Sequence, residues 1–167
     1  MKTCLVGCGG IAAVHGSVLT SGIDTEFVAA ADIKPEKAQS YAENFHTKPY
    51  PSLESMLEAE KPDVLHICTP HYLHVPMAIY SLERNINVFM EKPPAISFDQ
   101  LEELKKAAAK SEAQLGFCYQ NRYNASIRAA KDLIDSGKAG KVLGARAFVT
   151  WCRGAAYYTE SGWRGSL

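Results

Sequence analysis

The sequence predicts an α/β protein, in which a parallel sheet with helices on both faces is followed by the start of a second structural region. Two observations lead to this prediction. Short apolar runs of strand length alternate with stretches of helical period, which is typical of parallel sheets built from strand–helix–strand units. The composition, 47% apolar and 22% charged, is that of a globular chain with enough apolar mass for a core.

Six segments are predicted to be strands. Five of them are short, continuous apolar runs, as expected of strands that are buried on both faces. They are residues 4–6, 27–31, 64–68, 88–90 and 115–118, and a weaker strand is expected near Tyr50.

Helical periodicity fills the stretches between these strands. The first helix is expected to bury a face formed by Ile11, Val14, Val18 and Leu19, and the second a face formed by Ala38, Tyr41, Ala42 and Phe45. Pro35 suits the first turn of the second helix. Ser97 and Gln100 form a capping box ahead of a later helix, after which the doubly wound unit is expected to close at about residue 120.

A second region is expected from residue 121 to residue 167. It begins with a predicted helix over 124–136 that ends at Gly137, and continues into a long predicted strand over 141–152. A lone strand leaves its amides and carbonyls unpaired, and a stable sheet needs at least three strands. We therefore expect 1–120 to be a complete domain, 121–167 to be the incomplete beginning of another, and the chain to be the front part of a longer protein.

Charge and cysteine content exclude several classes of partner. Lys+Arg and Asp+Glu are equal at 18 each, so no net field attracts nucleic acid or anionic lipid, and a small-molecule ligand is the better expectation. The five cysteines include no CxxC pair, which favours reduced thiols and a cytoplasmic location. No signal peptide or membrane span is evident at the N-terminus.

A glycine-rich turn directly after the first strand predicts a dinucleotide site. Gly7 suits a tight turn, Gly9 allows backbone to approach a pyrophosphate, and Ala12 is the small residue where helix packs on strand. The helix that starts near Gly10 and Ile11 would direct free amides and its positive dipole end at the phosphates. This unit is typical of a Rossmann-type domain.

Asp32 ends the second predicted strand, at about the 20-residue spacing expected of the acidic residue that binds the adenosine ribose. The alternative is that Asp32 caps the helix at Pro35. A carboxylate here would accept from the 2′-hydroxyl and repel a 2′-phosphate, which favours NAD over NADP. Lys34 and Lys37 lie near enough to keep NADP possible.

Three further segments follow later strands, at the edge where open parallel sheets bind ligands. They are Thr69-Pro70-His71-Tyr72-Leu73-His74, Glu91-Lys92-Pro93-Pro94 and Gln120-Asn121-Arg122-Tyr123. With the glycine-rich turn, these motifs in this order resemble the N-terminal part of the glucose-fructose oxidoreductase/inositol dehydrogenase (Gfo/Idh/MocA) family over the whole chain. The resemblance implies an NAD(P)-dependent oxidoreductase of sugars, cyclitols and related hydroxy compounds, with an α+β substrate and dimerisation domain, here truncated, and therefore a homo-oligomer.

The same resemblance assigns the site residues. Lys92 is the expected catalytic residue, since its ammonium can hydrogen-bond the reacting hydroxyl or carbonyl and help to move the proton, and its bond to Pro93 is frequently cis in the family. The alternative is a surface lysine at a turn. The other expected cofactor contacts are Thr69, Pro70, His74, Glu91 and Gln120.

Two further expectations concern what is absent. His66 and Cys68 share one sheet face with no carboxylate expected nearby, so no metal site is predicted. Family members carry a catalytic histidine and aspartate in a later helix, which this sequence does not reach, so the fragment alone is expected to be nearly inactive. Two alternatives to a dehydrogenase are a dinucleotide-binding regulator without turnover and an NAD-dependent glycosidase of the same fold.

Overall fold

A computed structural model describes residues 1–22, 24–159 and 162–164 of the protein. The chain divides into two compact units, Met1–Tyr119 and Gln120–Leu167, and each is described by itself. Within the described part, no helix is long and apolar enough to cross a membrane. No disulfide links the five cysteines.

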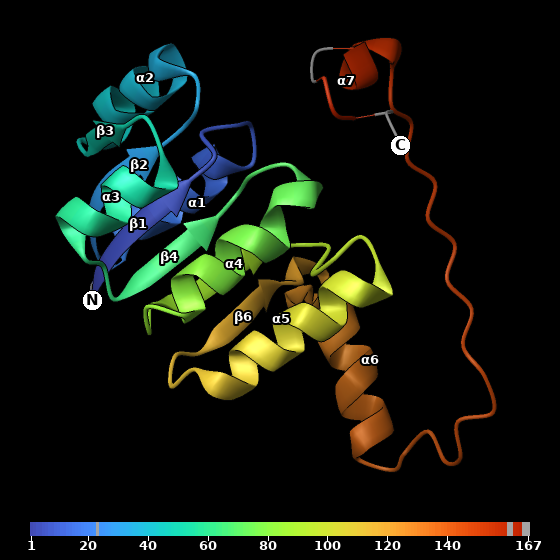
Figure 1. The fold of residues 1–167 in the computed structure, drawn as a ribbon. Coiled ribbons are helices and arrows are strands. Elements are labelled where there is room, and N and C mark those ends of the chain that lie inside the picture. Colours follow the sequence, from blue (N-terminus) through green and yellow to red (C-terminus); the bar gives the residue numbers. More distant parts are fainter. Residues whose placement is uncertain (23, 160–161, 165–167) are drawn as a thin grey trace. The chain divides into compact units, whose positions relative to one another are not determined.

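Six parallel strands form the sheet of the first unit, in the order β3-β2-β1-β4-β5-β6 (Figure 1). The strands span Lys2–Val6 (β1), Glu26–Ala31 (β2), Lys48–Tyr50 (β3), Val64–Ile67 (β4), Asn87–Glu91 (β5) and Leu115–Cys118 (β6). All six predicted strands are therefore confirmed. The strand order reverses direction between β1 and β4, and at such a point the carboxyl ends of the strands form a ligand-binding crevice.

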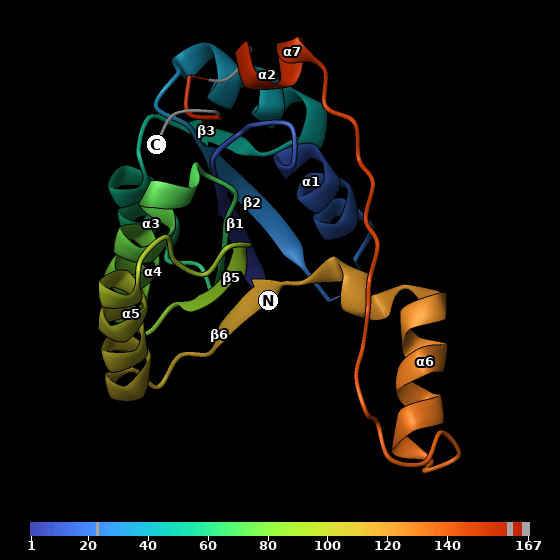
Figure 2. The same cartoon turned by 90° about the vertical axis from the view of Figure 1, so that its right-hand side faces the viewer.

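Helices cover both faces of this sheet, as predicted (Figure 2). One face carries α1 (Ala12–Ser21) and α2 (Pro35–Phe45), and the other carries α3 (Leu53–Glu60), α4 (His74–Leu82) and α5 (Phe98–Lys110). Pro35 occupies the first turn of α2. Ser97 caps α5 by accepting from the amide of Gln100 at 3.2 Å, while the Gln100 side chain accepts from the amide of Ile96 rather than that of Ser97.

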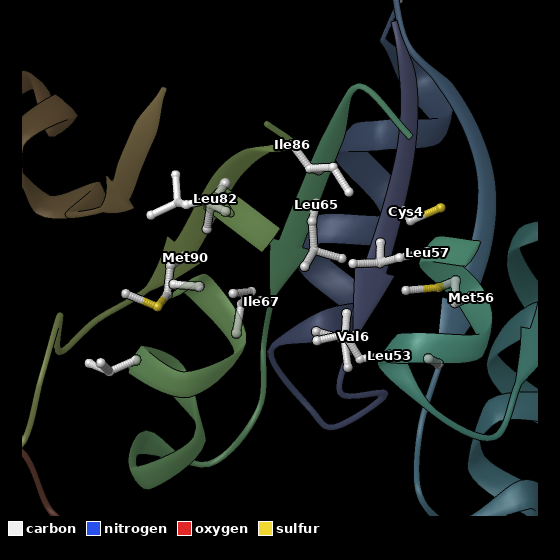
Figure 3. Packing of buried hydrophobic residues seen from close by; sticks show 14 of the residues in the cluster. Cys4, Val6, Leu53, Met56, Leu57, Leu65, Ile67, Leu82, Ile86 and Met90 are labelled. Atoms are coloured by element: carbon white, nitrogen blue, oxygen red, sulfur yellow. The ribbon is translucent and has the colours of Figure 1, made fainter. Parts of the chain in front are cut away.

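Alternating strand residues divide the core between the two faces. Cys4 and Val6 of β1 pack with the helices α3 to α5, whereas Leu5 between them packs with α1 and α2. Figure 3 shows Leu53, Met56 and Leu57 of α3 lying against the first of these strand faces, together with Leu65 and Ile67 of β4. Both faces of the central strands are thus apolar, which explains the continuous apolar runs in the sequence.

The predicted buried face of α1 is wrong in part. Val14 and Val18 are 59% and 63% exposed, and the residues that face the sheet are Ala12, His15, Gly16 and Leu19. Gly16 determines this face, because a Cβ there would lie 2.5 Å from the Tyr41 hydroxyl and 2.8 Å from the Phe45 ring. The smallest side chains, rather than the most apolar ones, allow α1 to pack closely against α2.

The described residues of the second unit form the helices α6 (Ala125–Asp135) and α7 (Ala155–Thr159) and a short 3₁₀ turn, η2 (Gln120–Tyr123). The helix expected over 124–136 is confirmed, and Gly137 follows it with a φ of 72°. The strand predicted over 141–152 is wrong, since these residues form neither helix nor strand. A strand requires a partner for its backbone hydrogen bonds, and the described residues offer this segment none.

Candidate functional site

The carboxyl ends of four strands bring together the segments expected to form the site. Gly7 follows β1, Asp32 follows β2, Thr69 lies just after β4, and Lys92 follows β5. Since β2, β1, β4 and β5 are consecutive neighbours in the sheet, their ends form one continuous edge. The site is therefore composed of four turns held by one rigid sheet.

Gly7 is required by the backbone itself. Its φ is 93°, and a Cβ there would lie 2.8 Å from the carbonyl carbon of Cys68 and 2.8 Å from the amide nitrogen of Thr69. Any side chain would therefore be strained and would also push apart the turns after β1 and β4. The tight-turn role predicted for this glycine has a direct structural cause.

The next residues leave donors available at the start of α1. Among the described residues, the amides of Gly9, Gly10 and Ile11 have no protein acceptor. A Cβ on Gly9 or Gly10 would meet no protein atom within 4 Å, so the space over the turn is open. Ala12 behind them is completely buried and anchors the start of the helix. Free amides at a helix N-terminus with open space above them are what a phosphate requires.

The carboxylate of Asp32 holds the turns after β1 and β2 together. One oxygen accepts from the amide of Cys8 at 2.9 Å, and the other accepts from the amide of Lys34 at 2.9 Å. The residue that caps α2 is Lys34, so the alternative of Asp32 as the helix cap is not realised. Asp32 is half-buried beside the glycine-rich turn, where an adenosine ribose would reach it.

Thr69 and Pro70 follow β4 at the same edge of the sheet. The Thr69 hydroxyl is buried and has no hydrogen-bond partner in the described part of the chain. Such an orphaned group beside the glycine-rich turn suggests a partner that the protein itself does not supply. Pro70 next to it is half-buried and starts a short 3₁₀ turn, η1 (His71–Leu73).

His74 lies under the edge rather than on it. It is completely buried, and its two ring nitrogens lie 2.8 Å from the carbonyl oxygen of Pro93 and 2.9 Å from that of Thr69. The ring thereby ties the turn after β4 to the turn after β5. The geometry gives His74 a bracing role, and leaves its surface covered by protein.

Glu91 ends β5 and is also buried. One carboxylate oxygen lies 3.1 Å from Nε2 of His15, and the other accepts from the amide of Lys92 at 3.3 Å. Burial alone would raise the pKa of Glu91, but hydrogen bonds from His15 and Cys118 outweigh it, so the pKa of this carboxyl lies below its usual value. Glu91 is therefore an ionised group held inside the protein.

Lys92 is the cation that follows β5 at this edge. Its side chain is exposed, and its peptide bond to Pro93 is cis. The sequence placed Gln120 in the same site, and Gln120 is the first residue of the second unit. The first unit thus supplies every predicted site residue except this one.

Sequence reasoning missed His15. It is buried at the sheet-facing side of α1, where Nδ1 lies 2.9 Å from Nδ1 of His66 while Nε2 contacts Glu91. The available signal was its position: His15 is three residues after Ala12 and next to Gly16, on the small-residue face that packs against the sheet. A histidine on such a face must have buried partners.

The ligand atoms of His15, Glu91 and Cys118 all lie within 4.8 Å of one another. No carboxylate was expected near His66, and the structure differs because His15 of α1 contacts both His66 of β4 and Glu91 of β5. Hydrogen bonds from His15 and Cys118 to Glu91 account for this closeness. The absence of a metal at this cluster stays a prediction.

Comparison with known proteins agrees with this geometry. Residues 1–119 match the GFO_IDH_MocA family, which is described as an oxidoreductase family with an NAD-binding Rossmann fold. The chain belongs to this family. The match confirms the predicted fold class and the predicted cofactor class, since GFO_IDH_MocA proteins are NAD-binding by description.

Relatives of this chain include proteins named as dehydrogenases. D-glucoside 3-dehydrogenase of Escherichia coli K12 is 28% identical over 98% of this chain and 46% of its own length. The WlbA dehydrogenase of Chromobacterium violaceum, solved with NADH and UDP-GlcNAcA, is 31% identical with a TM-score of 0.91, over 99% of this chain and 48% of its own.

A myo-inositol 2-dehydrogenase from Lactobacillus plantarum is 26% identical with a TM-score of 0.79, over 85% of this chain and 43% of its own. The chain therefore spans less than half the length of each of these three proteins.

Proposed function

We propose that the protein containing this chain is an NAD(P)-dependent oxidoreductase that acts on a hydroxyl of a sugar, a cyclitol or a related compound. The observation that carries the proposal is the shared edge, at which an open cradle of free amides after β1 lies two strands from a lysine after β5. The cradle suits a dinucleotide, and the lysine suits proton transfer.

The chain's own residues would divide the binding work. Gly9, Gly10 and Ile11 would donate their amides to the pyrophosphate, and the Thr69 hydroxyl would gain the partner it lacks. Asp32 would accept from the adenosine ribose and disfavour a 2′-phosphate, so NAD is the expected cofactor, with NADP possible. A bound nicotinamide supplies hydride transfer.

Lys92 would handle the proton. As the free base it would accept the hydroxyl proton of an alcohol substrate during oxidation, and as the ammonium it would return a proton to the carbonyl in the reverse direction. Its exposed side chain has room to meet a substrate, while the buried Glu91 and His74 hold the backbone on either side of it.

UDP-GlcNAcA is the first substrate to test. The WlbA dehydrogenase crystallised with it resembles this chain over 99% of the chain, whereas the inositol dehydrogenase resembles it over 85%. The coverage places a UDP-linked sugar ahead of an inositol, and a glucoside is the second substrate to test, since D-glucoside 3-dehydrogenase resembles 98% of the chain.

The cofactor assignment is tested by titrating the chain with NADH and NADPH and following nucleotide fluorescence. Asp32→Ala is expected to weaken NADH binding about 10-fold relative to NADPH, because a hydrogen bond to a charged group contributes about 1.5–3 kcal/mol. Asp99→Ala, which removes an exposed carboxylate in the first turn of α5, should leave the ratio of the two dissociation constants unchanged. An unchanged ratio in Asp32→Ala would count against the ribose contact.

The catalytic assignment is tested in the full-length protein with NAD and UDP-GlcNAcA. Lys92→Ala is expected to lower kcat by about 10²-fold or more while NADH still binds, as for loss of a general acid or base. Lys106→Ala removes an exposed lysine of α5 and should retain normal turnover. Normal turnover of Lys92→Ala would remove Lys92 from the mechanism.

The proposal also covers the domain boundary, the oligomeric state and the cellular location of the protein. We take residues 1–120 as the cofactor domain and 121–167 as the beginning of a substrate domain, and the division of the chain after Tyr119 supports this boundary. A homo-oligomer and a cytoplasmic location are part of the same proposal, and size-exclusion chromatography and cell fractionation test them.

A further inference from the structure

A continuous chain of buried hydrogen bonds runs from β4 through α1 to β5. Nδ1 of His66 lies 2.9 Å from Nδ1 of His15, and Nε2 of His15 lies 3.1 Å from a carboxylate oxygen of Glu91. The side chains of His15 and Glu91 are only 6% and 7% exposed, whereas His66 is half-buried. The ring of Phe89 lies against both imidazoles, with centroids at 6.0 and 5.1 Å.

This hydrogen-bond chain has two protonation states in which both of its hydrogen bonds are made. An ionised Glu91 requires a proton on Nε2 of His15. One further proton is then needed between the two Nδ1 atoms, because two lone pairs cannot face each other at 2.9 Å. Either His66 donates it to a neutral His15, or a doubly protonated His15 donates it to His66.

The two states differ by one proton and break no hydrogen bond. In the first state the net charge of the three groups is −1, and in the second it is zero. Burial and the charge of His15 lower the pKa of His66 to about 4, so the added proton does not stay on that ring. The pKa of Glu91 lies below its usual value, so the carboxyl stays ionised in both states.

The other titratable groups beside these three side chains do not take up the added proton in place of a histidine. The Cys118 thiol of β6 donates to Glu91, and Cys68, which directly follows β4, lies close enough to interact with the same carboxylate. Burial raises the pKa of the Cys68 thiol well above its usual range, so Cys68 stays neutral. Lys92 faces Glu91 from the open edge, and its positive charge also lowers the pKa of Glu91.

We propose that His66 and His15 form a two-histidine relay that loads one proton beside Glu91, and that His15 is thereby a positioning residue which sets the charge next to the nicotinamide. This inference rests on the proposed function for the location of the cofactor. With the adenosine ribose at Asp32 beside β2, a dinucleotide laid along the edge brings its nicotinamide to β4 and β5.

The proton path balances atom by atom. A proton from solvent binds Nε2 of His66, the partly exposed ring, while the proton on Nδ1 of His66 passes to Nδ1 of His15. His66 ends as the neutral Nε2–H tautomer and His15 as the cation. The reverse sequence releases the proton to solvent.

The relay couples proton uptake to the redox state of the cofactor. The oxidised nicotinamide ring is a cation and the reduced ring is neutral, so NAD⁺ favours the −1 state and NADH tolerates both. As pH falls and the relay loads its proton, NAD⁺ binding weakens relative to NADH binding. If one proton were fully coupled to the cofactor's redox state, the ratio of the NAD⁺ and NADH dissociation constants would change about 10-fold per pH unit. We expect a change of about 3-fold per pH unit.

The first test is made on the wild-type chain and needs no cofactor. Long-range ¹H–¹⁵N correlation spectra report which ring nitrogen of each histidine carries a proton. We expect His15 to gain a proton and His66 to change from the Nδ1–H to the Nε2–H tautomer in the same titration step. The exposed His46 serves as the internal reference. Independent titration of the two rings, or an unchanged His66 tautomer, would overturn the relay.

The second test measures NADH binding by fluorescence and NAD⁺ by competition, over the pH range in which the spectra show the relay loading its proton. His15→Gln keeps an amide donor for Glu91 but cannot titrate, so the ratio of the two constants is expected to become independent of pH. His46→Asn changes a histidine in a left-handed position that Asn tolerates and should keep the wild-type slope.

The outcomes separate the two proposals. A pH-independent ratio in the wild type, or an unchanged slope in His15→Gln, overturns the positioning role even if the spectra show a coupled pair. If the wild-type chain binds neither dinucleotide, the proposed function fails, while the spectra still decide whether the relay exists.

Discussion

Replacing Gly7 with alanine should damage the fold itself. An L-residue at a φ of 93° costs about 1–2 kcal/mol. The added Cβ would also lie 2.8 Å from backbone atoms of Cys68 and Thr69, which belong to the turn after β4 and cannot rotate away. Overpacking of this kind costs about 1–3 kcal/mol, so Gly7→Ala is expected to lose about 2–5 kcal/mol of unfolding free energy.

Gly9→Ala is the matched control two residues away. Its Cβ would meet no protein atom within 4 Å, so the stability of the fold should be almost unchanged. The same methyl group would occupy the open space over the free amides, and NADH binding should fall by about 10-fold or more, as expected when backbone can no longer approach a pyrophosphate.

Thermal unfolding followed by circular dichroism measures the first effect, and an NADH fluorescence titration measures the second. A loss of 2–5 kcal/mol corresponds to a fall in Tm of about 4–20 °C for a chain of this size. The reasoning is refuted if Gly7→Ala melts with the wild type, or if Gly9→Ala binds NADH normally.

Three other predictions concern stability and composition. Hydrogen bonds from Tyr50 and Lys48 lower the pKa of Glu60 to about 2, so its stabilising effect is present above the ordinary carboxyl pKa and is lost as pH falls from about 5 toward 2. Glu60→Gln should therefore cost about 2 kcal/mol at neutral pH and flatten acid unfolding curves, whereas the exposed Glu102→Gln should match the wild type. His74→Phe removes the ring N–H that lies between two buried backbone carbonyls and should lower the unfolding free energy in urea by about 1–3 kcal/mol. Elemental analysis of the purified protein is expected to find no stoichiometric zinc.

Much of the fold follows from local sequence patterns. Apolar runs bounded by turn residues located five of the six strands, because parallel strands in the interior of a sheet leave little polar alternation to obscure them. The sixth, β3, is a short edge strand that the sequence indicated only weakly, near Tyr50. The start of α2 at Pro35 and the cap of α5 at Ser97 were also predictable, since both depend on adjacent residues.

The predictions that proved wrong concern features determined by residues far away in the sequence. Val14 and Val18 have the right spacing for a buried face, but Gly16 allows the opposite side of α1 to approach Tyr41 more closely. Residues 141–152 have the composition of a strand, and the described residues provide no second strand to pair with them. Both outcomes depend on tertiary partners that a local pattern does not contain.

The site was predictable in its motifs and not in its connections. Gly7, Asp32 and Lys92 follow strands that the sequence already located, so their convergence at one edge could be expected. The partners of Glu91 and His74 could not, since His15 reaches Glu91 over 76 positions and His74 reaches Pro93 over 19. Only folding brings these groups within hydrogen-bond distance.

The side-chain ties across the sheet edge determine how this protein meets a ligand. Asp32 joins the turns after β1 and β2 by accepting from two main-chain amides, and the His74 ring joins those after β4 and β5 because it lies between two main-chain carbonyls. Four separate turns thus form a single preassembled rim before any nucleotide arrives. Little loop ordering remains to be done on association, so the amides of Cys8 and Lys34, which already donate to Asp32, should exchange about as slowly before binding as after it.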